Sequence, residues 1–272
     1  MSTPWRLLTT PPARGSWNMA VDEAILESTA RGEALPTLRL FAWQPACLSL
    51  GYAQPVADVD RARLDQRGWD LVRRPTGGKA ILHTDEITYS VAGPQTEPRL
   101  AGSVLESYRR LSTALLKALH LLGIPAQSQA EVLQNEHQPK GPVCFEVPSN
   151  YEITVEGKKL IGSAQARRRE GVLQHGALPL LGDLTRITAV LAFADEAERS
   201  LAAERLLMRA TTAETVLGYP LDWNTTAQAF TTAFEQTLDL ALAPAELTPA
   251  EIQRAAELER DKYSHSSWTE RV

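Results

Sequence analysis

Cysteine is scarce in this chain of 272 residues, which contains only Cys47 and Cys144. A secreted protein stabilised by disulfides normally carries more cysteines at regular spacings, so that class is excluded. Neither cysteine has partners at the spacing of zinc ligands, so a structural zinc site is not expected. Each thiol is therefore either a packing residue or a nucleophile.

Long hydrophobic runs and an excess of positive charge are also missing. No stretch reaches transmembrane length, and the N-terminal residues 1–15 lack the apolar run of a signal peptide. We therefore expect a cytoplasmic protein that does not contact a membrane. The net charge of −5 does not favour nucleic-acid binding. With 43% hydrophobic and 22% charged residues, the chain has the composition of an ordinary globular protein.

Hydrophobic periodicity predicts helices that alternate with short strands. Apolar residues recur at helical spacing in residues 18–31 and 104–122, and Ser103 with Glu106 matches a capping box. Residues 190–240 are mainly helical, and a last helix begins at Thr248-Pro249. Alternating or apolar runs predict the strands, which are residues 37–41, 46–50, 70–74, 80–83, 86–91 and 172–178 and a hairpin over 151–164.

This order of elements predicts an α+β fold with a mixed or antiparallel sheet flanked by helices. A short charged helix is expected over residues 57–67, and most of 125–142 is expected to be a loop. We expect one catalytic domain over residues 1–245 and a short C-terminal helical tail over 246–272.

Cys144 lies where an irregular segment meets a strand. A free cysteine is usually a small buried apolar residue. The alternative is a thiolate nucleophile, which needs a nearby cation to lower the pKa of the thiol.

Lys159 is the candidate for that cation. It follows a tight turn at Glu156-Gly157 and precedes a small, apolar run, residues 160–164. Lys158 and Lys159 point to opposite faces of a strand, so one of the two is expected to face inward. A lysine on a strand is more often solvated, but a buried lysine is costly unless it has a partner or a role.

The glycine-containing segment 73–80 joins two predicted strands. It is either a simple hairpin loop or a loop whose backbone N–H groups line an acyl or phosphate group. It matches neither the P-loop nor the dinucleotide-binding pattern. His83 and His175 have no partner at ligand spacing, so each is expected to be partly buried and hydrogen-bonded.

Basic residues cluster at Arg73-Arg74, Arg109-Arg110 and Arg167–Arg169. Such clusters are usually solvated faces of a protein. The alternative is that they dock an acidic partner.

Taken in order, six motifs resemble the biotin/lipoate ligase-like acyltransferases, and they cover nearly the whole chain. They are residues 18–23 (NMAVDE), 49–54 (SLGYAQ), 73–83 (RRPTGGKAILH), 159–165 (KLIGSAQ), 173–176 (LQHG) and 262–268 (KYSHSSW). The resemblance implies the fold of a biotin/lipoate-protein ligase catalytic domain. ATP-dependent lipoate ligases of this family typically have three successive glycines where this chain has Gly77, Gly78 and Lys79, and the common single-chain type has a larger C-terminal domain.

Cys144, 15 residues before Lys159, makes the chain similar to the cysteine-dependent branch of the family, the octanoyl-acyl carrier protein:protein octanoyltransferases. The resemblance implies that Cys144 and Lys159 are the catalytic residues. It also implies that the reaction needs no ATP, metal or other cofactor, because the acyl group of a thioester is already activated. The donor would be octanoyl-acyl carrier protein. The acceptors would be lipoyl domains such as glycine cleavage H protein or dehydrogenase E2 subunits. The implied substrate-binding residues are Arg73, Arg74, Thr76, Gly77, Gly78, His83, Gly162, Ser163 and Ala164.

Three alternatives stay open at the level of sequence. The chain could be an ATP-dependent lipoate ligase, in which activity survives loss of Cys144. It could relay octanoyl groups between two lipoyl domains, or it could be a non-catalytic protein that binds acyl groups or their carriers.

Overall fold

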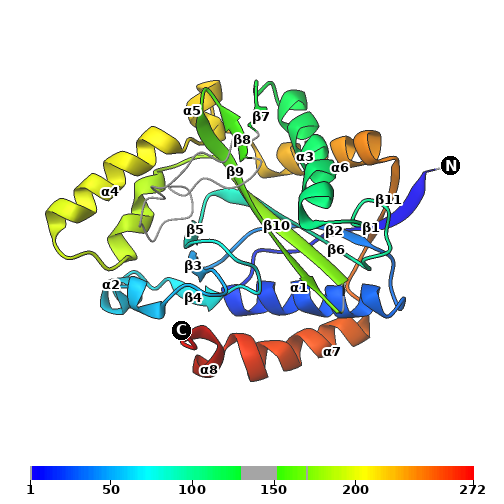
Figure 1. The fold of residues 1–272 in the computed structure, drawn as a ribbon, viewed down its shortest axis with the longest axis horizontal. Helices are drawn as coiled ribbons and strands as arrows, with labels where there is room; N and C mark the ends of the chain where they lie inside the picture. Colours follow the sequence, from blue (N-terminus) through cyan, green and yellow to red (C-terminus); the bar gives the residue numbers. More distant parts are fainter. Residues whose placement is uncertain (1, 130–151, 170) are drawn as a thin grey trace.

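The computed structural model describes residues 2–129, 152–169 and 171–272, and an eight-stranded sheet is its centre (Figure 1). β11 and β2 run parallel to β1, and the neighbours beyond β2 pair antiparallel. The sheet is therefore mixed, as predicted. Its strands, in spatial order, are β11 (Leu240–Ala245), β1 (Thr3–Thr9), β2 (Thr37–Phe41), β6 (Glu86–Gly93), β10 (Gly171–Pro179), β9 (Lys158–Arg168), β8 (Glu152–Val155) and β7 (Gln127–Gln129).

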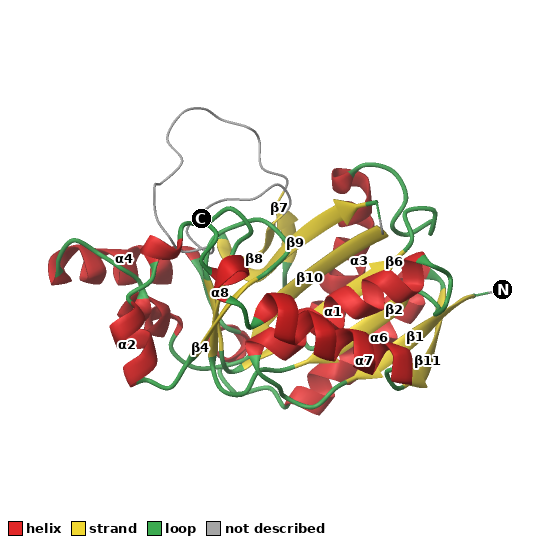
Figure 2. Ribbon diagram, turned by 90° about the horizontal axis from the view of Figure 1, so that it is seen from below, coloured by secondary structure: helices red, strands yellow, loops and turns green. Residues whose placement is uncertain are grey.

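Helices cover both faces of this sheet (Figures 1 and 2). α1 (Gly15–Ala30) packs on β6 and β10 from one side, and α7 (Pro249–Leu258) packs on the outer side of α1. α3 (Val104–Leu121) and α6 (Trp223–Leu238) pack against each other on the opposite side. The predicted capping box of Ser103 and Glu106 is present at the start of α3.

A second sheet of three strands lies beside the first. It consists of β4 (Asp70–Arg73), β3 (Cys47–Leu50) and β5 (Ile81–His83), with β3 in the middle. The segment between β4 and β5 is the glycine loop, residues 74–80. The shorter helices are η1 (Val56–Asp58), α2 (Arg61–Gln66), η3 (Leu184–Val190), α4 (Glu196–Arg209) and α5 (Ala213–Leu217).

The structure corrects the sequence prediction at two places. β1 and β11 were not predicted, because neither shows clean alternation, and they form through their parallel pairing with each other. The helix expected over 57–67 is two helices, η1 and α2, because the Asp60 side chain accepts from Arg63 N–H and starts a new helix there. Most of 125–142 was expected to be a loop; β7 occupies three residues of this segment, and residues 130–142 lie outside the described residues.

Residues 246–272 form α7, a π-helical turn η4 (Glu259–Tyr263) and α8 (Ser266–Thr269). Charged pairs attach this segment to the rest of the protein. Glu251 is 2.6 Å from Arg6, and Lys262 is 2.6 Å from Glu23 on α1. The division at residue 245 stays a prediction, but the C-terminal segment packs directly on α1.

Candidate functional site

A cavity of about 500 Å³ lies between the central sheet and the glycine loop. Its volume is within the range of small-molecule sites. The wall is mostly apolar, with contributions from α1, the second sheet, the start of α3 and strands β9 and β10. Of the substrate-binding residues predicted from sequence, Arg74, Gly77, Gly78, His83, Gly162, Ser163 and Ala164 line it.

Small residues on β9 and β10 make room for this cavity. Gly162, Ser163 and Ala164 of β9 face it together with Gly176 of β10. A Cβ atom on Gly176 would lie 2.5 Å from Ser163 Oγ and 2.7 Å from a Tyr89 ring carbon. Glycine is therefore required at position 176, because the two strands and Tyr89 approach too closely for a larger residue.

Lys159 faces the cavity from the start of β9. Its side chain is almost fully buried, whereas Lys158 is exposed, so the expectation that one of the pair faces inward is confirmed. Lys159 Nζ lies 2.7 Å from Glu152 Oε1 on β8. This ion pair offsets the cost of removing the ammonium group from water.

Arg74 holds the glycine loop in its conformation. Its guanidinium group donates to the backbone oxygens of Ser49, Gly77 and Lys79, at 3.0, 2.8 and 2.7 Å. Gly78 has a φ of +94°, which favours glycine. Arg74 therefore positions the loop, so that Gly77 and Gly78 present their backbone to the cavity.

Arg73 lies outside the cavity wall. Its guanidinium group donates to the backbone oxygens of Gly51, Gln54 and Thr269, at 2.8, 2.6 and 2.8 Å. It thereby joins the C-terminal segment to β3 and β4. The expectation that Arg73-Arg74 forms a solvated or docking face is wrong, because both side chains are buried.

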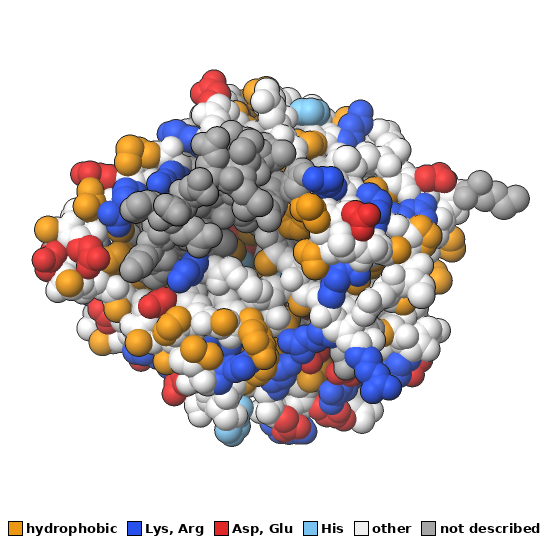
Figure 3. Space-filling view, in the orientation of Figure 1, with side chains coloured by type: hydrophobic (Ala, Val, Ile, Leu, Met, Phe, Trp, Pro, Cys, Tyr) orange, Lys and Arg blue, Asp and Glu red, His pale blue; other side chains and the backbone are white. Residues whose placement is uncertain are grey.

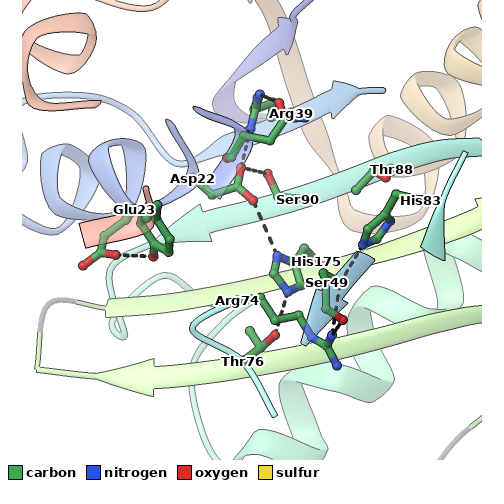
Figure 4. Close-up of polar contacts among 12 residues, drawn as sticks. Asp22, Glu23, Arg39, Ser49, Arg74, Thr76, His83, Thr88, Ser90 and His175 are labelled. Carbon is green, nitrogen blue, oxygen red and sulfur yellow. Dashed lines mark hydrogen bonds and ion pairs between the residues drawn. The ribbon is translucent and has the colours of Figure 1, made fainter. Parts of the chain in front are cut away.

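Two chains of hydroxyl, imidazole and carboxylate groups stand behind the cavity (Figure 4). In the first, His83 Nε2 is 2.8 Å from Ser49 Oγ, and His83 Nδ1 is 2.7 Å from Glu86 Oε1. Trp43 stacks on the His83 ring with centroids 4.0 Å apart. Ser49 and His83 both line the cavity.

The second chain connects α1 to the glycine loop. His175 Nε2 is 2.7 Å from Thr76 Oγ1, and His175 Nδ1 is 3.5 Å from Asp22 Oδ2. Burial lowers the pKa of His175. Burial alone would raise the pKa of Asp22, but Arg39 at 2.8 Å and His175 outweigh burial and lower this pKa.

Thr76 itself does not line the cavity and reaches it only through His175. Both histidines are buried and hydrogen-bonded, as expected from sequence. The Asp22–His175 contact was missed, because residues 153 positions apart give no local signal. Their only sequence signal was that each lies in one of the family-like motifs, residues 18–23 and 173–176.

The two cysteines were expected to differ in role. Cys47 is buried in the core, and burial raises the pKa of its thiol well above the ordinary value, so it is a neutral packing residue. Cys144 lies outside the described residues. Within residues 2–129, 152–169 and 171–272, no group of three His, Cys, Asp or Glu residues is arranged to hold a metal ion.

Residues 14–235 match the model of the lipoyl protein ligase A/B catalytic domain. The chain belongs to this family. Two relatives named octanoyltransferase LipM are those of Kyrpidia tusciae, 41% identical over 98% of both chains, and Symbiobacterium thermophilum, 39% identical over 100% of both. Solved structures of lipoyl protein ligases agree with the fold.

A bipartite lipoate protein ligase from Thermoplasma acidophilum has a TM-score of 0.80 and 26% identity, over 99% of this chain and 96% of that one. A lipoate-protein ligase A bound with ATP has a TM-score of 0.78 and 25% identity, over 99% of both chains. The predicted family and the predicted lipoate-protein ligase fold are therefore confirmed. Among the described helices, none is both long and apolar enough to cross a membrane.

Proposed function

We propose that this lipoyl protein ligase A/B family member transfers an octanoyl group from octanoyl-acyl carrier protein to the lysine of a lipoyl domain, through a thioester on Cys144. The reaction class, octanoyl transfer in protein lipoylation, follows from full-length relatives at 34–41% identity, such as the enzyme of Staphylococcus epidermidis. The prediction of an octanoyltransferase is thus confirmed. The donor, the acceptor and the role of Cys144 are the proposal.

The observation that carries this proposal is an apolar cavity with a buried lysine in its wall. An octanoyl chain gains roughly 0.8 kcal/mol for each methylene it buries, so such a cavity can bind it without polar recognition of the chain. Lys159 supplies a cation in that wall, paired with Glu152. Such a cavity can bind the apolar acyl chain and place its carbonyl end beside the Lys159 ammonium group.

The reaction takes two steps. The Cys144 thiolate attacks the carbonyl carbon of the donor thioester, a new carbon–sulfur bond forms, and the carrier leaves as its own thiolate. The neutral amine of the acceptor lysine then attacks the octanoyl-enzyme. The amide bond forms, Cys144 leaves as a thiolate, and the surplus proton of the amine passes to a base. Splitting the transfer in this way is ordinary covalent catalysis.

Lys159 acts in both steps as an electrostatic partner. Its ammonium group stabilises the Cys144 thiolate and the negative charge that develops on the acyl oxygen. Its burial strengthens this effect, because charges interact more strongly away from water. The Gly77–Gly78 backbone and the β9 wall hold the acyl chain.

The test is an intact mass measurement on protein incubated with octanoyl-acyl carrier protein in the absence of ATP. We expect one octanoyl group on the wild type, removable by hydroxylamine, and none on Cys144→Ala. Cys47→Ala is the matched control and is expected to be acylated normally, since the Cys47 thiol is buried in the core. Addition of a lipoyl domain should then discharge the acyl-enzyme.

Other outcomes assign the alternatives. If no acyl-enzyme forms, but ATP and free lipoate modify a lipoyl domain equally well with wild type and Cys144→Ala, the protein is a ligase and the proposal is wrong. If the enzyme is acylated only by an octanoylated lipoyl domain, it relays octanoyl groups between such domains.

A further inference from the structure

A second hollow, of about 420 Å³, lies at the far end of β9. The glycine loop, the end of β9 and the C-terminal segment enclose it. Three residues line both this hollow and the apolar cavity of about 500 Å³ described above: Gly77, Gly78 and Gln165. The two spaces are therefore neighbours that share one wall. The other side chains that line the hollow and enter the argument are Tyr52, Arg167, Arg168 and Trp268.

Arginine side chains line this hollow, and Arg168 also lines a smaller hollow together with Glu23 and Glu27. Among the described residues, neither Arg168 nor Arg271 forms an ion pair with a carboxylate. The Arg271 guanidinium group lies 4.1 Å from the centroid of the Tyr52 ring and 5.3 Å from the centroid of the Trp268 ring. Arg167 donates only to neutral acceptors, such as Ser107 Oγ at 2.8 Å. On the face seen in Figure 3, Lys and Arg side chains lie on the left-hand, right-hand and lower parts, with Asp and Glu side chains among them.

Arg271 and Arg168 both lie close enough to Tyr52 to lower the pKa of its phenol, Arg271 more strongly. Burial lowers the pKa of Arg167, Arg110 lowers this pKa further, and Glu106 opposes both effects. Arg271 likewise adds to the effect of burial on the pKa of Arg73. A bound anion would be attracted to Arg168 and Arg271, because neither forms an ion pair among the described residues.

We propose that this hollow binds the phosphate of a phosphopantetheine arm, the arm that presents the octanoyl thioester to the enzyme. The inference rests on the proposed function for the identity of the acyl donor. Arginine is suited to phosphate, because its planar guanidinium group can form two parallel hydrogen bonds to phosphate oxygens. Tyr52 and Trp268 form the apolar sides of the hollow, next to the pantetheine chain.

The position of the hollow along β9 agrees with this arrangement. Six residues of strand separate Arg168 from Gly162, which at about 3.3 Å per residue is about 20 Å. An extended pantetheine arm can bridge this span. With its phosphate at Arg168, the arm runs past Gln165 and places the thioester beside Gly162, within reach of the Lys159 side chain in the same cavity wall.

The acceptor does not fit the hollow as well as the donor does. An acceptor lysine carries no phosphate, and an acidic protein surface is too broad to enter a concave site between Arg168 and Trp268. The same arm occurs in a carrier protein and in free acyl-coenzyme A, so the two sources share this chemistry and the experiment must separate them.

The test measures acyl-enzyme formation with octanoyl-carrier protein, octanoyl-coenzyme A and octanoyl-pantetheine, which lacks the phosphate. Arg168→Gln is expected to lower kcat/KM about tenfold for the two phosphorylated donors and to leave octanoyl-pantetheine unchanged. Arg168→Lys keeps the charge and should recover part of the loss. Arg169→Gln removes the same charge from an exposed neighbour that does not line the hollow, and should affect all three donors little.

Binding of 4′-phosphopantetheine and pantetheine, measured by calorimetry, tests the site without turnover. Wild type should bind the phosphorylated form about tenfold more tightly, and Arg168→Gln should remove the difference. This result would stand even if no acyl-enzyme formed, so failure of the proposed function and failure of the phosphate site are distinguishable. A loss limited to the carrier protein would show that Arg168 contacts the carrier itself, and would overturn the phosphate assignment.

Equal losses in Arg168→Gln and Arg169→Gln would mean that overall charge attracts the donor, and would also overturn the site. The phosphate site would also be overturned if Arg168→Gln lowered kcat/KM equally for octanoyl-pantetheine. The same holds if Arg168→Gln affected only the transfer to the lipoyl domain. Thermal unfolding of each variant checks that the fold is intact.

Discussion

The two ends of β9 differ sharply in burial and charge. At its start, Lys159 is buried and paired with Glu152, and the strand faces an apolar cavity. At its end, Arg167 and Arg168 line a polar hollow near Arg271. The middle of the strand consists of small residues that line the cavity, with Gly162 buried and Ser163 and Ala164 half-buried.

This difference suits the two ends of one strand to different tasks, stabilising the reacting group at the start and attracting the donor at the end. A single buried charge with a fixed partner is suited to stabilise a reacting group, because little reorganisation is needed when the reaction occurs. Several half-exposed charges are suited to attract and orient an anionic partner. A β-strand joins the tasks at a fixed distance, since it cannot shorten without breaking its hydrogen bonds to β10.

The largest effect is expected at the start of β9. Lys159→Met should slow acyl-enzyme formation by about 10³-fold, because the cation that stabilises the thiolate and the developing oxyanion is lost. Lys158→Met is the matched control and should change the rate little, since Lys158 points to solvent. Single-turnover kinetics with octanoyl-carrier protein measure both. Equal effects of the two substitutions would remove Lys159 from the mechanism.

A smaller effect is expected in the middle of the strand. Ala164→Leu should fill part of the cavity and shift the preference from octanoyl to shorter chains. If the room for two methylenes is lost, octanoyl binding weakens by about 1.6 kcal/mol, or about 15-fold. Competition between octanoyl and hexanoyl donors gives this ratio, with Ala164→Gly as the control that adds no volume. An unchanged ratio would place the acyl chain elsewhere.

His175, which faces Ala164 across the β9–β10 pairing, is expected to make stability depend on pH. Its folded pKa lies below the ordinary value of 6.5, so the unfolded chain takes up this proton first as the pH falls. Below about pH 6.5, the free energy of unfolding should fall by at most about 1.4 kcal/mol per pH unit, until the folded pKa is reached.

Denaturant unfolding at pH 7.0 and 5.5 measures this dependence. His175→Gln should flatten it between these two pH values. The same slope in wild type and variant would assign the dependence to other groups.

The smallest effect is expected at the end of β9. Raising the ionic strength from about 0.02 to about 0.3 M should lower kcat/KM for the carrier donor about threefold, because salt screens half-exposed charges. The rate of chemistry at saturating donor should not change, since the Lys159–Glu152 pair is buried. If salt lowered the rate at saturating donor and left kcat/KM unchanged, the assignment of chemistry to the start of β9 and of donor attraction to its end would be wrong.

Local patterns predicted much of the fold. Ser103 and Glu106 form a capping box and residues 104–122 carry an apolar stripe, and α3 begins at that box and ends within one residue of the prediction. The hairpin around Glu156-Gly157 is present, with both turn residues at positive φ. These features depend on residues close in sequence, which is why they could be predicted.

The candidate site was predicted in part, for the same reason. Lys159 and residues 162–164 were expected on one strand and lie on β9, where the structure places all four in the cavity wall. The glycine loop was also found, because glycines at a tight turn leave a local signal.

The sequence by itself therefore determined most of the helices and strands, the inward orientation of one lysine of the pair 158–159, and the family. Only the tertiary structure decided that Arg73 binds backbone oxygens of the C-terminal segment while Arg74 holds the glycine loop. It alone joined Asp22 to His175 and placed Tyr52, Arg168 and Trp268 around one hollow. The physical reason is that a local pattern fixes which way a side chain points from its own element, whereas its partners depend on how distant elements pack.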